Sequence, residues 1–389
     1  MISTITARVA GRYESLTTRP IALYGSAVLR IGYALTYLAF LLREFPNREQ
    51  LWGPDAAWTP ALARQYAHAA DWYGWVRSWN LLLATGNDTR FELSYALALA
   101  ICAAMAAGLW TRFTSVGFML VVTSFTARDV FLGDGGDSVL QLMSIYLVFT
   151  ACGQRLSLDR RRRARRGTPR RPPTGTVRAE LAELRRRAVT LVHNAAVLVV
   201  GCQMCVIYGA AALWKVQGGT WQNGTALYYT MHVDWFRVWP GLSDLATGNS
   251  VEICLIAYLT VFVQLGFPFA VFSKRLKYVL LVLLLAMHLG IALLMGLPVF
   301  SAAMIIGDSV FLPDPFWLAV GRLLTGFRDR FRDRFRDRFR DRFRDRFRDR
   351  ARPAAGAAPT GPEAEQAQAG LPASDPAGAA DPALVREGG

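Results

Sequence analysis

The chain has 389 residues, of which 53% are hydrophobic and only 19% are charged. An average soluble chain has about 25% charged residues, and the apolar residues here gather into stretches close to the roughly 20 residues that cross a bilayer. This composition disfavours a soluble protein and predicts an all-α, polytopic integral membrane bundle that contacts the lipid bilayer.

About eight transmembrane helices are predicted. In chain order the apolar spans cover residues 21–42, 91–110, 113–131, 138–154, 188–213, 251–272, 277–298 and 299–312. The last span is short and stops at Pro313 and Pro315, so it either crosses with little tilt or continues as an interfacial helix through Phe316 to Leu324. The stretch Pro60–Leu83 mixes aromatic and polar residues at helical spacing, which predicts helices in the outer interface.

The net charge of +15 is concentrated in two segments. Residues 155–187 hold 13 Arg against three acids, and residues 327–350 hold 12 Arg against six Asp. This basicity indicates membrane orientation and not a nucleic-acid partner. With eight spans, every Lys- and Arg-rich loop falls on one side, so both termini are predicted to be cytoplasmic and the loops 44–90, 134–137 and 214–250 to face outward.

Four regions are expected. They are a cytoplasmic N-terminal segment (1–20), a transmembrane domain (21–325) with the Arg-rich cytoplasmic loop, a Phe-Arg-Asp-Arg repeat (326–350) and an Ala/Pro/Gly-rich tail (351–389). Because a four-residue period advances about 400° in a helix, the Phe row winds around the axis. We therefore expect the repeat to be solvated and partly disordered, with attraction to anionic lipid as the alternative, and the tail to be disordered.

Ionisable residues inside spans are candidates for function. Arg30 lies nine residues into the first span and Asp308 nine residues into the eighth, which runs the other way. We expect these two side chains to pair near the middle of the membrane, either as a structural ion pair or as part of a site. Cys202 and Cys205 stand mid-span, where a cysteine behaves as a small apolar residue, so the sequence leaves their redox state open.

The stretch from Tyr208 to Met231 carries the clearest chemical signal. Lys215 follows an apolar helix at its outer end, and Trp221 and Gly224 come shortly after. A lysine amine held out of water gives up its proton more readily and can act as a base. The alternative is a lysine that anchors the helix end at the headgroups.

Three motifs together resemble the HTTM (horizontally transferred transmembrane domain) family. They are Lys215-x5-Trp221-x2-Gly224, Gly135-Gly136-Asp137 leading through the fourth span to Gly153–Asp159, and His288-Leu-Gly-Ile-x4-Gly296 followed by Phe300-Ser301. The family includes the vitamin K-dependent gamma-carboxylase and the bacterial membrane protein B of the sporulation-delaying toxin system. The resemblance covers about residues 20–312.

The resemblance implies a bacterial inner-membrane, multi-pass protein that helps mature or modify an exported peptide at the outer face, with an accessory maturation protein as a possible partner. It assigns Lys215 as the candidate base and Trp221, Gly224, Asp137, His288, Arg30 and Asp308 as candidates for a substrate cavity. Two alternatives stay open, namely a carboxylase-like enzyme that uses a reduced quinone, and a non-catalytic scaffold or immunity protein. Carboxylation is disfavoured because the chain lacks the carboxylase's large lumenal domain and has Asp137-Ser138-Val139-Leu140 where that enzyme has a His beside a Ser-Tyr-Leu run. The sequence leaves open whether the protein is an enzyme; it predicts no metal.

Overall fold

The computed structural model describes all residues except 1–13, 70–81, 83–86, 168–174 and 351–389. In the described residues all regular structure is helical and no strand occurs. The longer helices are α2 (Leu23–Glu44), α4 (Pro60–Ala69), α6 (Asp88–Ala107), α7 (Thr111–Arg128), α8 (Gly135–Phe149), α9 (Leu158–Arg165), α10 (Val177–Gln217), α13 (Pro240–Thr247), α14 (Ser250–Ala270), α15 (Lys274–Leu294), α16 (Pro298–Asp308) and α17 (Asp314–Arg350). Short connections are η1 (Phe45–Asn47), α3 (Arg48–Trp52), η3 (Cys152–Gln154), α11 (Gly219–Gln222), α12 (Ala226–His232), η4 (Asp234–Phe236) and η5 (Ser309–Phe311). The predicted all-α class is confirmed.

Among the residues that the structure describes, five helical segments are long and apolar enough to cross a membrane. They are Leu23–Trp52, Asp88–Ala107, Val177–Gln217, Ser250–Ala270 and Lys274–Leu294, and a sixth results if the bent pair Pro298–Phe311 and Asp314–Arg330 is one span. A helix is present at each of the eight predicted spans, but α8 has only 15 residues, or about 22 Å at 1.5 Å per residue, against a hydrocarbon core of about 30 Å. The chain is a multi-pass helical membrane protein, and the count of eight stays a prediction.

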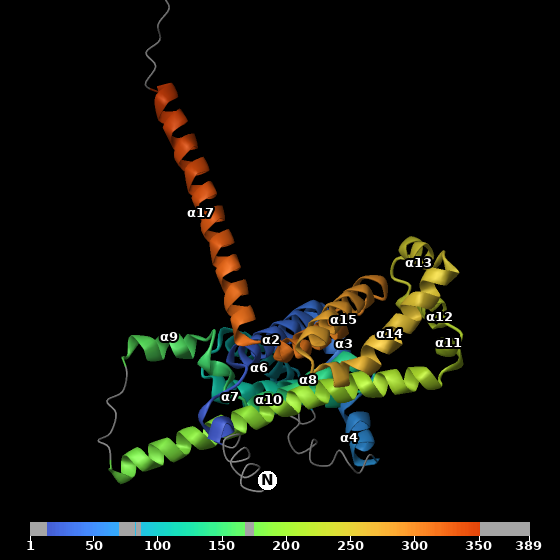
Figure 1. Cartoon of the computed structure of the whole chain (residues 1–389), viewed down its shortest axis with the longest axis horizontal. Coiled ribbons are helices and arrows are strands. Elements are labelled where there is room, and N and C mark those ends of the chain that lie inside the picture. The colour runs from blue at the N-terminus through green and yellow to red at the C-terminus, as the bar shows by residue number, and fades with distance from the viewer. Residues whose placement is uncertain (1–13, 70–81, 83–86, 168–174, 351–389) are drawn as a thin grey trace, which may run out of the picture. The chain divides into compact units, whose positions relative to one another are not determined.

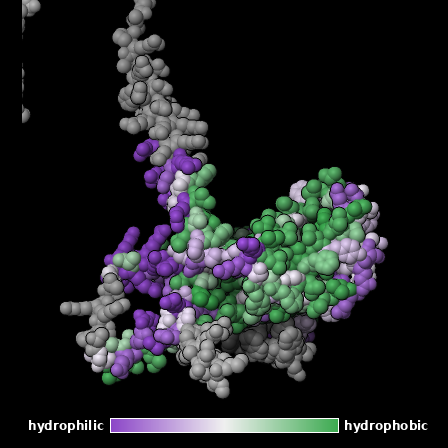
Figure 2. Space-filling model, in the orientation of Figure 1, coloured by the Kyte–Doolittle hydropathy of each residue, from purple (hydrophilic) through white to green (hydrophobic). Residues whose placement is uncertain are grey.

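The surface has the distribution of polarity that a membrane protein needs. Figure 2 shows hydrophobic residues over α14 and α15, with hydrophilic residues around α9 and the start of α10 and again over α11 to α13. Exposed Leu255, Phe262 and Phe269 on α14 and Val282 and Leu293 on α15 contribute to the apolar area. An exposed apolar surface of this kind is unfavourable in water but favourable in contact with lipid, so it is typical of a membrane-facing surface.

Contacts divide the chain into two units, Met1–Leu323 and Leu324–Gly389. In the first unit the short helix α16 lies at the centre, because it packs on α2, α8, α15 and α10. Gly307 permits this packing, since a Cβ at this position would lie 2.6 Å from Met204 Sδ. The core therefore forms where the eighth predicted span is inserted among the others.

The predicted interfacial helices at Pro60–Leu83 are described only in part. Helix α4 covers Pro60–Ala69, and residues 70–81 and 83 of this prediction lie outside the described residues. The break after the eighth predicted span is present, since η5 ends at Phe311 and α17 begins at Asp314. Pro313 accounts for the break because it cannot donate a helix hydrogen bond.

The Phe-Arg-Asp-Arg repeat differs from its prediction. It is helical to Arg350, as the continuation of α17, where the sequence predicts a partly disordered segment. Each internal Asp has Arg three residues before and after it, as Asp333 has Arg330 and Arg336, and such spacing stabilises a helix even when no apolar face exists. The predicted disorder of the tail concerns residues outside the described ones.

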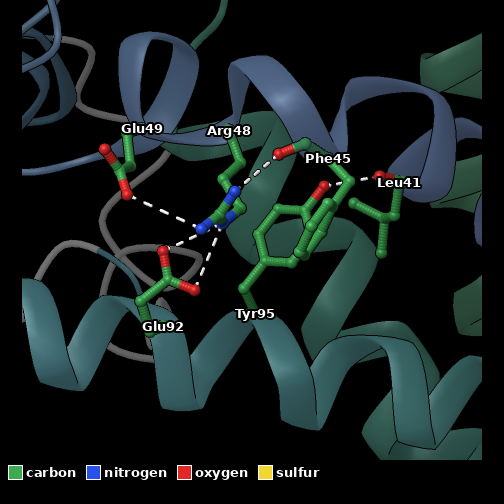
Figure 3. Close-up of polar contacts among 6 residues, drawn as sticks. All are labelled: Leu41, Phe45, Arg48, Glu49, Glu92 and Tyr95. Atoms are coloured by element: carbon green, nitrogen blue, oxygen red, sulfur yellow. Dashed lines mark hydrogen bonds and ion pairs between the residues drawn. The ribbon is translucent and has the colours of Figure 1, made fainter.

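A polar cluster joins α3 to α6 (Figure 3). Arg48 Nε lies 2.9 Å from Glu92 Oε1, and its Nη1 donates to the Phe45 carbonyl at 2.8 Å. Beside it, the Tyr95 hydroxyl donates to the Leu41 carbonyl at 2.6 Å. The bond from Tyr95 satisfies the Leu41 carbonyl in the last turn of α2, where a helix leaves carbonyls without a partner of its own.

The stretch Gly153–Asp159 serves as a cap for two helices. Asp159 accepts hydrogen bonds from the Trp110 and Thr111 amides at 2.9 and 2.8 Å and from the Thr111 hydroxyl at 3.0 Å, at the start of α7. Ser157 Oγ accepts from the Arg160 amide at the start of α9. Burial raises the pKa of Asp159, but the hydrogen bonds from Thr111 and Trp110 outweigh burial and hold its pKa below the ordinary value.

We expect Asp159→Asn to lower the free energy of unfolding at neutral pH by about 0.5–1 kcal/mol, because asparagine keeps one acceptor oxygen but removes the negative charge at the start of α7. Because the folded pKa lies below the unfolded one, the carboxylate's contribution is present above pH of about 4 and is lost as pH falls through the folded pKa. The contribution of the carboxylate is measured by comparing the melting temperatures of wild type and Asp159→Asn in detergent at pH 7 and at pH near 3. Asp55→Asn, at an exposed aspartate, is the control; an equal difference at both pH values would contradict the capping role.

Candidate functional site

One cavity of about 550 Å³ lies between α10, α14, α15 and α16. Residues of α11, α12 and α13 close it on the side of the loop 214–250. Its walls are mainly aliphatic, and the side chains on them with polar atoms are Tyr208, Lys215, Trp221, Thr230, Thr260, Gln264 and His288. A large apolar pocket with a few convergent polar groups is the usual form of a small-molecule site.

Lys215 places its amine at this cavity. Its Nζ donates to Gln264 Oε1 at 3.0 Å and to the Ala211 carbonyl at 3.4 Å, and it lies 5.3 Å from the centroid of the Trp221 ring. No carboxylate within the described part of the chain forms an ion pair with it. The amine of Lys215 therefore has only neutral hydrogen-bond partners among these residues, in an apolar pocket. No carboxylate of the described residues holds the charged form of the lysine, so the amine is free to give a proton to a bound ligand or take one from it.

A second set of polar side chains meets at Tyr208 in the cavity wall. The Tyr208 hydroxyl donates to Asp308 Oδ2 at 2.8 Å and lies 3.1 Å from His288 Nε2. Because a hydroxyl has one proton, His288 Nε2 is the donor to the Tyr208 oxygen when Tyr208 donates to Asp308. His288 Nδ1 then carries a lone pair, and no described protein group bonds to it or to Asp308 Oδ1.

The predicted pair of Arg30 and Asp308 is wrong. Arg30 is fully buried and donates to four carbonyls: those of Met105, Ala106 (2.8 Å), Leu156 (2.7 Å) and Cys152 (3.4 Å). The physical reason is that α6 ends at Ala107, and the last carbonyls of a helix are unpaired and carry partial negative charge. Asp308 instead bonds to Tyr208 from α10.

Two further candidates lie outside the cavity wall and have structural roles. Asp137 Oδ2 accepts from the Asp134 amide at 2.9 Å, and Asp134 accepts from the Gly136 amide, so both cap α8. Gly224 has φ of +76° and a Cβ there would lie 2.5 Å from Cys254 Sγ. Glycine at this position lets the turn after Trp221 press against α14.

Of the seven predicted site residues, the cavity brings together Lys215, Trp221 and His288, with Asp308 one hydrogen bond away. Tyr208 and Gln264 complete the site but were not assigned to it from the sequence. A signal for Tyr208 exists, since it precedes Lys215 by seven residues and so lies on the same helix face. Gln264 is one of the few polar residues inside a span, which marks it as costly to place there.

The described residues contain no group of three or more His, Cys, Asp or Glu that could hold a metal ion. Cys202 and Cys205 are free.

No family model, curated protein or solved structure matches the chain. The class rests on the helices themselves, which define a multi-pass membrane protein with a cavity among its spans.

Proposed function

We propose that this chain is a bacterial inner-membrane protein of the HTTM type that helps mature or modify an exported peptide at the outer face, with Lys215 as a base. The proposal includes eight spans with both termini in the cytoplasm. The single observation that carries it is the cavity, because Lys215 and Trp221 from one motif of the resemblance and His288 from another line the same space.

The place of the cavity supports action on an outward-facing substrate. The cavity is bordered by the short helices α11, α12 and α13, which belong to a loop with few Lys or Arg. The Arg-rich helix α9 lies at the opposite end of the bundle (Figure 1). Because cytoplasmic loops carry an excess of Lys and Arg, the end with α9 is assigned to the cytoplasm and the end with the cavity to the outside. A peptide can then approach without crossing the bilayer.

The alternative of a reduced-quinone, carboxylase-like enzyme has a specific observation in its favour. The walls from α14 and α15 are aliphatic, with Ile256, Leu259, Val263, Leu283 and Ile291 among them, and suit a flat apolar ring. In that case Lys215 removes the proton of the bound hydroquinone, and Trp221 holds the amine in place.

The test is mass spectrometry of exported and membrane peptides from wild type, a deletion strain, and strains with Lys215→Ala, Lys215→Arg or Lys277→Ala. We expect modification of one exported peptide to fall about 100-fold or more in the two Lys215 variants, the usual cost of losing a general base. Lys277→Ala is the matched control, since this lysine also lies near a helix end, at the start of α15.

The outcomes separate the hypotheses. A missing mass of carbon dioxide on Glu in the deletion and in both Lys215 variants identifies the carboxylase-like enzyme. If a peptide fails to mature only in the deletion strain, Lys215 is not a base and the protein is a scaffold.

A further inference from the structure

Helix α10 is too long for the membrane alone. Its 41 residues extend about 60 Å at 1.5 Å per residue, about twice the hydrocarbon thickness. Its N-terminal part, from Val177 to Arg187, carries four Arg and two Glu and so lies beyond the hydrocarbon core. Yet Val177, Leu181 and Leu184 in this part are 71%, 59% and 64% exposed.

These exposed residues begin a heptad stripe. Positions that alternate by four and three residues are Val177, Leu181, Leu184, Ala188, Leu191, Ala195, Leu198 and Cys202, and all are exposed. At 100° per residue they stay within an arc of about 100°. Buried Val200 and Met204, which pack into the bundle, lie on the opposite face. Spacing of this kind is typical of a coiled-coil seam.

We propose that α10 pairs with α10 of a second copy of this chain in a parallel homodimer, through the stripe from Val177 to Cys202. Two copies have the same orientation in the membrane, so their α10 helices run parallel about a two-fold axis along the membrane normal. The small residues Ala188, Ala195 and Cys202 recur every seventh position, which lets helices approach closely in lipid.

Charge complementarity selects a second copy as the occupant. Glu180 and Arg185 flank the stripe on opposite sides, at the two heptad positions that face each other across a parallel seam. With a separation of five residues, Glu180 of one protomer meets Arg185 of its partner, twice in a symmetric dimer. Within the described part of the chain neither residue forms an ion pair.

The first test uses Cys202 itself, since two cysteines facing each other across a close seam can form a disulfide. Full-length protein in native membranes is oxidised with copper phenanthroline in a Cys205→Ser background. We expect a covalent dimer that Cys202→Ser abolishes. With Cys202→Ser and Cys205→Ser as the background, Leu184→Cys is expected to restore it, and Arg186→Cys, about 160° around the helix, is not. Equal cross-linking at both positions, or at neither, would overturn the proposal.

The second test exchanges the charges. Glu180→Arg and Arg185→Glu are each expected to reduce dimer formation about fivefold, since like charges replace two exposed ion pairs, and the double exchange is expected to restore it. Restoration is specific to pairing between copies. If Glu180→Arg instead increases binding of the protein's Arg-rich segment to anionic vesicles while the double exchange rescues nothing, the stripe lies on lipid headgroups and the dimer is excluded.

Discussion

Replacement of Arg30 by methionine is expected to prevent accumulation of folded protein. Methionine keeps the aliphatic stem of the side chain but removes the buried guanidinium that donates to the carbonyls of Met105, Ala106 and Leu156. Loss of one partner from a buried charged network costs about 3–5 kcal/mol, a large part of a typical domain's stability. The measurement is the monodisperse yield and melting temperature of the detergent-extracted protein.

Arg43→Met is the matched control on the same helix. Arg43 is exposed, pairs with neighbouring Glu44 and lies 5.5 Å from the centroid of the Phe40 ring, and surface contacts of these kinds contribute about 1 kcal/mol or less each. The stability of Arg30→Lys is expected to lie between those of the two methionine variants, because one ammonium nitrogen cannot reach all the carbonyls that the planar guanidinium reaches. A wild-type melting temperature for Arg30→Met would show that the four carbonyls find other donors.

Gly136→Ala is expected to give the second largest loss of stability, about 3 kcal/mol, as in an overpacked core. A Cβ at Gly136 would lie 2.6 Å from Phe300 Cα, a backbone atom of α16, and 2.8 Å from Asp134 Oδ1. The backbone cannot give way as a side-chain tip does, so α8 and α16 must move apart. The melting temperature of purified protein measures the loss.

The neighbouring glycine supplies the control. A Cβ at Gly135 would lie 3.5 Å from the Phe300 ring, an ordinary contact, so Gly135→Ala is expected to change stability by about 1 kcal/mol or less. If Gly135→Ala and Gly136→Ala have the same melting temperature, the close approach of α8 to α16 is not the reason for glycine at position 136.

The pattern of apolar residues determined the helices. Every predicted span contains a helix, because a run of apolar residues without water must satisfy its backbone internally. The sequence also marked Lys215 and His288, since ionisable groups near or inside a span are few and costly to place, and it marked Trp221 through the motif that it shares with Lys215. It overestimated disorder in the repeat, where spaced charges favour a helix.

Only the tertiary structure decided which of these groups meet. Arg30 and Asp308 each lie nine residues into their spans, but the distance along two helices does not define which faces of the helices turn toward each other. Arg30 instead bonds to carbonyls at the C-terminal end of α6. Tyr208 joins His288 to Asp308 because α16 is packed between α2, α8, α10 and α15. Apolar periodicity determines which residues are helical, whereas the choice of neighbours depends on side-chain packing between segments far apart in the chain.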